Sequence, residues 1–319
     1  GFDLITNTEN LTGSDFDDTL YGSTGDNVIR GGAGDDYIFA RSGNDTVEGG
    51  DGADEMNGAT GIDTLTYASA SAGVTVDLSM TTAQDTSGAG VDTISNFENL
   101  TGSAFADTLA GDSGANIIDG GDGIDTISYL GASAAVTVNI GNTSAQDTVG
   151  AGTDTLLNFE NLTGSAFDDV LNGSTADNSI LGGDGNDIID GGNGNDTIEG
   201  GAGADVLNGG AGFTNTVSYA ASASGVTVNT ANNTTSGGDA EGDIISNFRD
   251  IIGSAFNDIL TGDRVSNIYG GAGDDLLLSG SEYNVILGED GDDRLGFGVI
   301  GFSVAVSFKN SFIGGDGTD

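Results

Sequence analysis

The chain has 319 residues, 50 of them acidic and 6 basic, which gives a formal net charge of −44. This charge excludes nucleic acid as a natural partner, because phosphate recognition needs a basic surface. Membrane insertion is also excluded, because no apolar run is long enough to span a bilayer. The absence of Cys and His excludes disulfides, the usual zinc sites and His-based catalysis, so a bound cation is the expected source of stability and charge compensation.

Nonapeptide repeats begin at Gly13 and continue through six uninterrupted copies to residue 66. Glycines at positions one, two and four allow positive φ in a tight turn, and the last three residues form a short strand. The apolar side chain at position eight is expected to point inward. One repeat is then half a coil, so two repeats complete a turn, and repeats i and i+2 lie on the same edge. The sequence therefore predicts an all-β parallel solenoid.

Four blocks of such repeats are present, at 13–66, 102–128, 164–218 and 253–296. The most regular copies are GGAGDDYIF at 31–39, GGDGNDIID at 182–190, GGNGNDTIE at 191–199 and GGAGDDLLL at 270–278. Between the blocks lie three inserts, 67–101, 129–163 and 219–252, each opening with Tyr and containing an alternating strand such as VTVDL. Nearly two coils fit in each insert. The inserts are therefore expected to continue one solenoid over 1–319 without metal-binding turns.

The pattern G-G-x-G-x-D-x-U-x, where U is apolar, closely resembles the calcium-binding nonapeptide of the repeats-in-toxin (RTX) hemolysin-type proteins. Because many copies occur in phase over most of the chain, the resemblance is specific. It implies a right-handed parallel β-roll with calcium-binding turns, type I secretion, and folding triggered by calcium outside a bacterial cell. Extracellular calcium modules bind with dissociation constants of about 10⁻⁴–10⁻³ M.

Calcium is expected between stacked turns, where a carboxylate from each turn and several backbone carbonyls supply hard oxygen ligands. Magnesium fits such a cage less well, because it prefers a small octahedral shell and retains its waters. The predicted carboxylate ligands are Asp18, Asp36, Asp45, Asp54, Asp63, Asp107, Asp125, Asp169, Asp187, Asp196, Asp205, Asp258, Asp275 and Asp293. The predicted carbonyl ligands include those of Gly32, Gly34, Gly183, Gly185, Gly192, Gly194, Gly271 and Gly273.

The energetics of one repeat also point to a bound ion. Burying one aliphatic residue contributes about 1.5–3 kcal/mol, whereas ordering a residue's backbone costs about 1–2 kcal/mol, and each repeat orders nine residues. Ion binding must supply much of the difference. The calcium-free chain is therefore predicted to be largely unfolded.

Two sets of residues allow two interpretations each. The second repeat of every block has Asn at position six: Asn27, Asn116, Asn178 and Asn267. These amides either mark a weak or absent ion or simply cap a turn. Aromatic residues recur with the inserts: Phe97, Phe105, Phe159, Phe167, Phe248 and Phe256. They are either a carbohydrate-stacking platform or core residues, and the core interpretation is favoured.

The two ends of the chain match each other. The tail 297–319 joined to residues 1–12 would form a fourth insert of the same length as the first two, and SVAVSF at 303–308 resembles the VTVDL strand. This match favours a tandem array or a subunit that associates end to end with copies of itself. An arbitrary excision from a longer chain of similar inserts would give the same join.

Repeats and inserts fill the whole chain, which favours an extracellular or cell-surface structural protein that stiffens on binding calcium, such as a stalk, adhesin shaft, surface layer or filament. The alternative is an accessory module of a type I-secreted enzyme or toxin. The sequence contains no nucleophile–base pair, and acidic pairs such as Asp35 and Asp36 fall within a predicted calcium turn. The chain is therefore not expected to be an enzyme.

Overall fold

The computed structural model describes residues 9–263, 265–280, 285–297 and 311–314. The described chain divides into two compact units, the first up to residue 133 together with 142–161, the second from 134–141 and from 162 onward. Both are built from short strands, and one 3₁₀ turn, η1 (Gly238–Ala240), is the helical element of the described residues. The prediction of an all-β parallel solenoid is confirmed.

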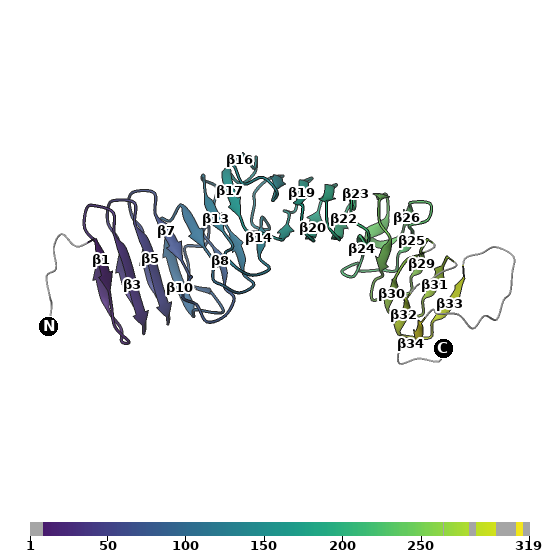
Figure 1. Ribbon diagram of the computed structural model, residues 1–319, viewed down its shortest axis with the longest axis horizontal. Helices are drawn as coiled ribbons and strands as arrows, with labels where there is room; N and C mark the ends of the chain where they lie inside the picture. Colours follow the sequence, from purple (N-terminus) through teal and green to yellow (C-terminus); the bar gives the residue numbers. More distant parts are fainter. Residues whose placement is uncertain (1–8, 264, 281–284, 298–310, 315–319) are drawn as a thin grey trace. The chain divides into compact units, whose positions relative to one another are not determined.

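The first unit contains three ladders of parallel strands, two of which end in an antiparallel pair (Figure 1). One ladder has the order β1 (Asn10–Thr12), β3 (Val28–Ala33), β5 (Thr46–Asp51), β7 (Thr64–Thr66), β11 (Asn99–Thr101), β13 (Ile117–Asp119), β17 (Thr153–Leu157) and β16 (Gln146–Asp147). The second has the order β2 (Thr19–Tyr21), β4 (Tyr37–Phe39), β6 (Glu55–Asn57), β10 (Val91–Ser95) and β9 (Gln84–Asp85). The third joins β8 (Thr75–Asp77), β12 (Thr108–Ala110) and β14 (Thr126–Ser128).

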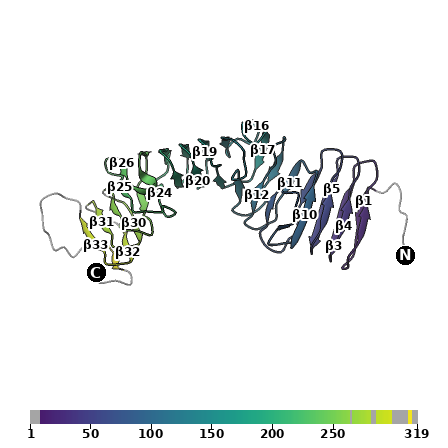
Figure 2. The ribbon, with the colours of Figure 1, turned by 180° about the vertical axis from the view of Figure 1, so that it is seen from behind.

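The second unit also contains three ladders, and Figure 2 shows its last strands from behind. One has the order β15 (Thr137–Asn139), β19 (Val170–Ser174), β21 (Ile188–Gly192), β23 (Val206–Asn208) and β27 (Ile244–Ser246). Another runs from β20 (Ser179–Asp184) through β22 (Thr197–Ala202), β24 (Thr216–Ser218), β28 (Asp250–Ile252), β30 (Ile268–Ala272) and β32 (Val285–Asp290) to β34 (Ser311–Gly314). The last has the order β26 (Thr234–Ser236), β25 (Thr227–Asn229), β29 (Ile259–Thr261), β31 (Leu276–Ser279) and β33 (Arg294–Phe297). Strand β18 (Asn161–Thr163) contains the chain boundary between the units.

The register of the ladders follows from the repeat. Leu20 pairs with Ile38 and Ile29 with Val47, so each strand stacks on the strand two repeats later. Position-eight side chains fill the interior, and most of them are completely buried, as Ile38 and Val47 are. Burying one such side chain contributes about 1.5–3 kcal/mol. The predicted inward direction of position eight is therefore confirmed.

The inserts replace one ladder and continue the other. In the insert 67–101, β11 stacks on β7 through the pair Leu65–Leu100, so that ladder is unbroken. The opposite ladder ends at β10 with its antiparallel partner β9, and a new ladder starts from β8, which pairs with β12. The insert 219–252 does the same, since β28 continues from β24 while β27 ends one ladder and β25 starts the next.

The predicted division into blocks and inserts, as one solenoid over 1–319, remains a prediction. The described residues form two units. Most residues of the proposed end segment, 297–319 with 1–12, lie outside the residues that the structure describes.

Candidate metal-binding turns

Position-six side chains form hydrogen-bonded columns along the edges of the coil. On one edge, the backbone N–H of Asp18 donates to Oδ1 of Asp36 at 2.8 Å, and that of Asp36 donates to Oδ1 of Asp54 at 2.9 Å. On the other edge, the N–H of Asn27 donates to Oδ1 of Asp45 at 2.7 Å. The second unit has an equivalent column of Asp169, Asp187 and Asp205. The turns therefore share edges as the spacing predicts, and the column fixes one oxygen of each carboxylate.

The second carboxylate oxygen, Oδ2, has no hydrogen-bond partner in ten of the described position-six aspartates, and it is buried in all ten. They are Asp36, Asp45, Asp54, Asp63, Asp125, Asp187, Asp196, Asp205, Asp275 and Asp293. Leaving a buried acceptor unpaired costs about 1–3 kcal/mol, and more when the group is charged. A cation is the partner that such an oxygen fits, so these ten predicted ligands match a metal-binding turn.

The glycine at position one brings a backbone carbonyl close to this oxygen. A Cβ added to Gly182 would overlap both Oδ2 of Asp187 and the carbonyl oxygen of Gly200, one turn further on. A Cβ on Gly31 would in the same way meet Oδ2 of Asp36 and the carbonyl oxygen of Gly49. Carboxylate and carbonyl oxygens therefore converge at each glycine, and such oxygens are the ligands that calcium prefers.

Backbone carbonyls are an essential part of this donor set. Within the described ranges, no three acidic, His or Cys side chains converge as a metal cluster. The eight glycines predicted to offer carbonyl ligands all have φ between 94° and 126°, which is accessible mainly to glycine. A Cβ on Gly50 would overlap the carbonyl oxygen of Gly32, so that carbonyl faces the next turn. The ligand role of these carbonyls remains a prediction.

The carboxylates of the columns carry negative charge that protein groups do not compensate. Burial, with added repulsion from neighbouring carboxylates, raises the pKa of Asp54, Asp187, Asp205 and Asp275 to about 7. For the same reasons, the pKa of Asp63, Asp125 and Asp196 is raised to about 6. Hydrogen bonds from the backbone oppose these shifts without cancelling them. The columns therefore favour either a proton or a bound cation.

Four of the predicted ligands differ from these ten. Asp18, Asp107, Asp169 and Asp258 occupy the first repeat of their blocks, where position two is Ser instead of Gly. The backbone N–H of Ser165 donates to Oδ2 of Asp169 at 2.6 Å, and its hydroxyl donates to Oδ1 at 2.8 Å. Corresponding serine contacts reach the other three carboxylates. Both oxygens of Asp107, Asp169 and Asp258, and Oδ2 of Asp18, therefore already have protein partners.

Three of the four asparagines at position six cap turns. Oδ1 of Asn27 accepts the N–H of Ser23 at 2.6 Å, and Oδ1 of Asn178 accepts that of Ser174 at 2.6 Å. Oδ1 of Asn116 accepts the N–H of Asp112 at 2.9 Å. This geometry supports the capping interpretation for these three repeats, whereas Oδ1 of Asn267 accepts the N–H of Val285 at 3.3 Å.

The inserts contribute three buried aspartates that the sequence interpretation missed. Asp92, Asp154 and Asp243 continue the columns, because the N–H of Asp54, Asn116 and Asp205 donates to their Oδ1 atoms. In each, Oδ2 accepts a tyrosine hydroxyl: from Tyr67 at 3.0 Å, from Tyr129 at 3.3 Å and from Tyr219 at 2.9 Å. The Tyr that opens every insert was the available signal, since it precedes this Asp by nearly constant spacing.

Position five, which the repeat pattern treats as variable, forms a second hydrogen-bonded column of side chains that the sequence did not predict. Oδ1 of Asp17 accepts the N–H of Asp35 at 3.0 Å, and Oδ1 of Asp35 accepts that of Ala53 at 2.9 Å. Asp35 and Asp36 therefore belong to two different columns. The backbone N–H groups donate toward the later turn in the column of Asp36 and toward the earlier turn in the column of Asp35.

The recurring aromatics have two different environments. Phe97, Phe159 and Phe248 are buried, as the core interpretation predicted. Phe105, Phe167 and Phe256 are 43–46% exposed, so for these three the core interpretation was wrong. They follow the first glycine of a block by three residues, which places them on the turn rather than on the strand.

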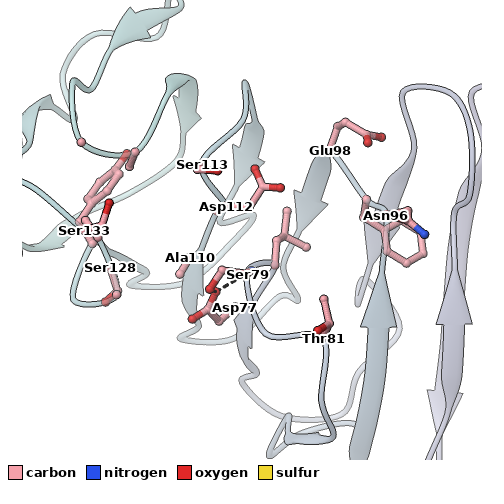
Figure 3. Close-up of a pocket in the computed structure, with 18 residues that line it drawn as sticks. Asp77, Ser79, Thr81, Asn96, Glu98, Ala110, Asp112, Ser113, Ser128 and Ser133 are labelled. Carbon is pink, nitrogen blue, oxygen red and sulfur yellow. Dashed lines mark hydrogen bonds between the residues drawn. The ribbon is translucent and has the colours of Figure 1, made fainter.

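A pocket of about 520 Å³ lies in the first unit, lined by Asp77, Glu98 and Asp112 among others (Figure 3). Asp77 accepts hydrogen bonds from the N–H and hydroxyl of Ser79, at 2.8 and 2.6 Å. Glu98 accepts the N–H of Asp63, and Asp112 accepts that of Gly114. The pocket is therefore lined by carboxylates that already accept backbone N–H groups.

The comparisons with known proteins agree with this geometry. The family described as RTX calcium-binding nonapeptide repeat (4 copies) matches residues 12–47, 38–65, 86–127, 163–198, 181–213 and 268–298, which together span more than half of the chain. No curated protein matches the sequence. No helix in the described part of the chain is long and apolar enough to cross a membrane.

Proposed function

Because the chain belongs to the RTX calcium-binding nonapeptide repeat family, we propose that it is an extracellular structural repeat protein whose coil folds and stiffens when calcium binds. The observation that carries the proposal is the set of ten buried Oδ2 atoms without a hydrogen-bond partner. Repeated acceptors of this kind, spaced one turn apart, suit a fold that depends on cations along its length.

The chain's own residues prepare each turn for the ion. The backbone N–H of the preceding turn fixes Oδ1 of a carboxylate such as Asp187, and the glycine at position one leaves room for Oδ2 and a carbonyl oxygen. Bound calcium would supply the positive charge that these oxygens lack. Each ion would also offset two formal charges of the −44 carried by the chain.

A structural role, such as a stalk, adhesin shaft, surface layer or filament, is supported by the extent of the repeats, because both units consist of stacked turns. End-to-end self-association and type I secretion are further parts of the proposal. We also propose that the chain has no catalytic activity of its own. The carboxylates discussed above serve turns and ladders, and the sequence has no His or Cys.

The proposal is tested by negative-stain electron microscopy and circular dichroism in millimolar calcium and again in chelator. We expect β structure in calcium that is largely lost in chelator, together with fibres or sheets that disperse. Near-native secondary structure in chelator would contradict calcium-dependent folding. Compact isolated particles in calcium would instead favour an accessory module of a secreted enzyme or toxin.

A further inference from the structure

We propose that the backbone at position two of each repeat decides whether that repeat binds calcium, an inference that rests on the proposed function and deepens it. In every described turn whose Oδ2 lacks a partner, the residue at position two has positive φ. These residues are Gly32, Arg41, Gly50, Ala59, Gly121, Gly183, Gly192, Gly201, Gly271 and Glu289. Each lies four residues before one of the ten aspartates whose Oδ2 has no partner.

Seven other turns of the blocks, those with this spacing and with every residue described, show the opposite arrangement. Their position-two residues do not have positive φ. The backbone N–H of each donates a hydrogen bond to the position-six side chain. These residues are Ser14, Ser23, Ser103, Asp112, Ser165, Ser174 and Ser254. We call these turns closed and the ten others open.

The two arrangements differ in what they offer to a cation. In a closed turn such as that of Asp169, both carboxylate oxygens accept protein donors: the N–H and hydroxyl of Ser165 and the N–H of Val136. These hydrogen bonds compensate the charge. In an open turn such as that of Asp187, Oδ2 is buried and has no donor, so an ion satisfies it.

Three open turns show that positive φ does not merely follow from glycine. Arg41, Ala59 and Glu289 have φ of 80°, 71° and 69°, which is unfavourable for residues with a Cβ. All three precede an aspartate with an unpaired Oδ2: Asp45, Asp63 and Asp293. Positive φ is therefore retained at three residues whose Cβ disfavours this conformation, as expected if the bound ion stabilises the open turn.

The inference divides the predicted ligands into two classes. Ten aspartates bind calcium through Oδ2, whereas Asp18, Asp107, Asp169 and Asp258 are held by serine and do not. Closed turns are the first two repeats of the first three blocks and the first repeat of the fourth. Calcium-binding turns therefore begin only after the closed turns of each block.

The test compares two neighbouring aspartates of one column in the full chain. The N–H of Asp169 donates to Oδ1 of Asp187, so the two carboxylates lie one turn apart. Calcium bound per folded chain is measured by equilibrium dialysis with elemental analysis for wild type, Asp187→Asn and Asp169→Asn. We expect Asp187→Asn to lose at least one ion and Asp169→Asn to keep the wild-type number. Equal losses would overturn the inference while leaving calcium binding intact, and a wild-type chain without calcium would overturn both proposals.

A third variant keeps the inference testable if Asp169→Asn does not fold. Ser165→Gly removes the serine hydroxyl and permits positive φ at position two. We expect this chain to bind at least one ion more than wild type. An unchanged calcium number in folded Ser165→Gly would overturn the inference.

Discussion

The aspartates of the columns use their two carboxylate oxygens differently. Oδ1 accepts a backbone N–H from the preceding turn in both units, as in Asp36 and Asp187. Oδ2 has one of three environments: unpaired as in Asp187, bound by serine as in Asp169, or bound by tyrosine as in Asp154 of an insert. One residue type thus supports turns with and without a metal, depending on which donor is near.

The tyrosine of an insert should matter for stability and not for calcium binding. Tyr129→Phe leaves Oδ2 of Asp154 with the hydroxyl of Thr148 alone, at 3.2 Å. Losing this donor to a buried carboxylate should cost about 1–3 kcal/mol. Thermal unfolding in calcium should therefore occur at a lower temperature than in wild type. Tyr21→Phe, at a residue that is 51% exposed, is the control, and an equal effect of both variants would contradict the role.

Ala59 should be a site where glycine stabilises the chain. Its φ of 71° costs an L residue about 1–2 kcal/mol relative to glycine. Ala59→Gly should increase the free energy of unfolding in calcium by up to about that amount, measured by denaturant titration. Ala53→Gly is the matched control at a turn residue outside the positive-φ set, where added backbone freedom should destabilise. A loss of stability in Ala59→Gly would show that the positive φ is not strained.

At the scale of the strand, a typical three-residue element buries its central side chain. Ile189 in β21 is 1% exposed, whereas the preceding Ile188 is 52% exposed. Successive side chains of a strand point to opposite faces, so only one of the two can enter the core. The strands are short because the turns between them take up most of each repeat.

This alternation gives a direct comparison of two adjacent isoleucines. Ile189→Ala should destabilise the calcium-bound chain by about 2–5 kcal/mol, because it creates a cavity in the core. Ile188→Ala should change stability far less, since its side chain is half in solvent. Thermal or denaturant unfolding of both variants checks this. Equal losses would mean that β21 is in another register.

The repeat pattern predicted these strands, their register and the columns, because glycine spacing and position eight determine them locally. It did not predict Asp92, Asp154 or Asp243, since their column positions depend on how an insert folds back on the preceding block. It also treated Asp169 and Asp187 alike. The difference lies at position two, where Ser165 donates its backbone N–H to the carboxylate of Asp169. The residue type at position six does not show this.

At the scale of the whole molecule, charge decides whether the coil holds without calcium. Many carboxylates of one sign lie in columns one turn apart, and the chain has few basic residues to balance them. The ion pairs of the described part join Arg30 to the buried Glu48 at 3.1 Å and Arg249 to the buried Asp250 at 3.7 Å, and neither includes a position-six aspartate. Compensation in the columns must therefore come from cations or protons.

The metal-free chain should accordingly be more ordered in mild acid than in base. Burial raises the folded-state pKa of Asp187 and Asp205 from the ordinary 3.8 to about 7. Stability from this protonation is fully present below the unfolded-state pKa and is lost as the pH rises through about 7. Circular dichroism of calcium-depleted protein should show more β structure at about pH 5 than at about pH 8. Less structure at the lower pH would contradict this assignment.

The way in which the inserts exchange ladders has a mechanical consequence. Where one ladder stops at β10 or β27, the ladder on the opposite face passes without interruption through β7 and β11 or through β24 and β28. A tensile load along the coil therefore always meets an unbroken row of backbone hydrogen bonds at these two inserts. A fracture that opens one face cannot cross the coil there without also breaking the hydrogen bonds of the continuous ladder on the other.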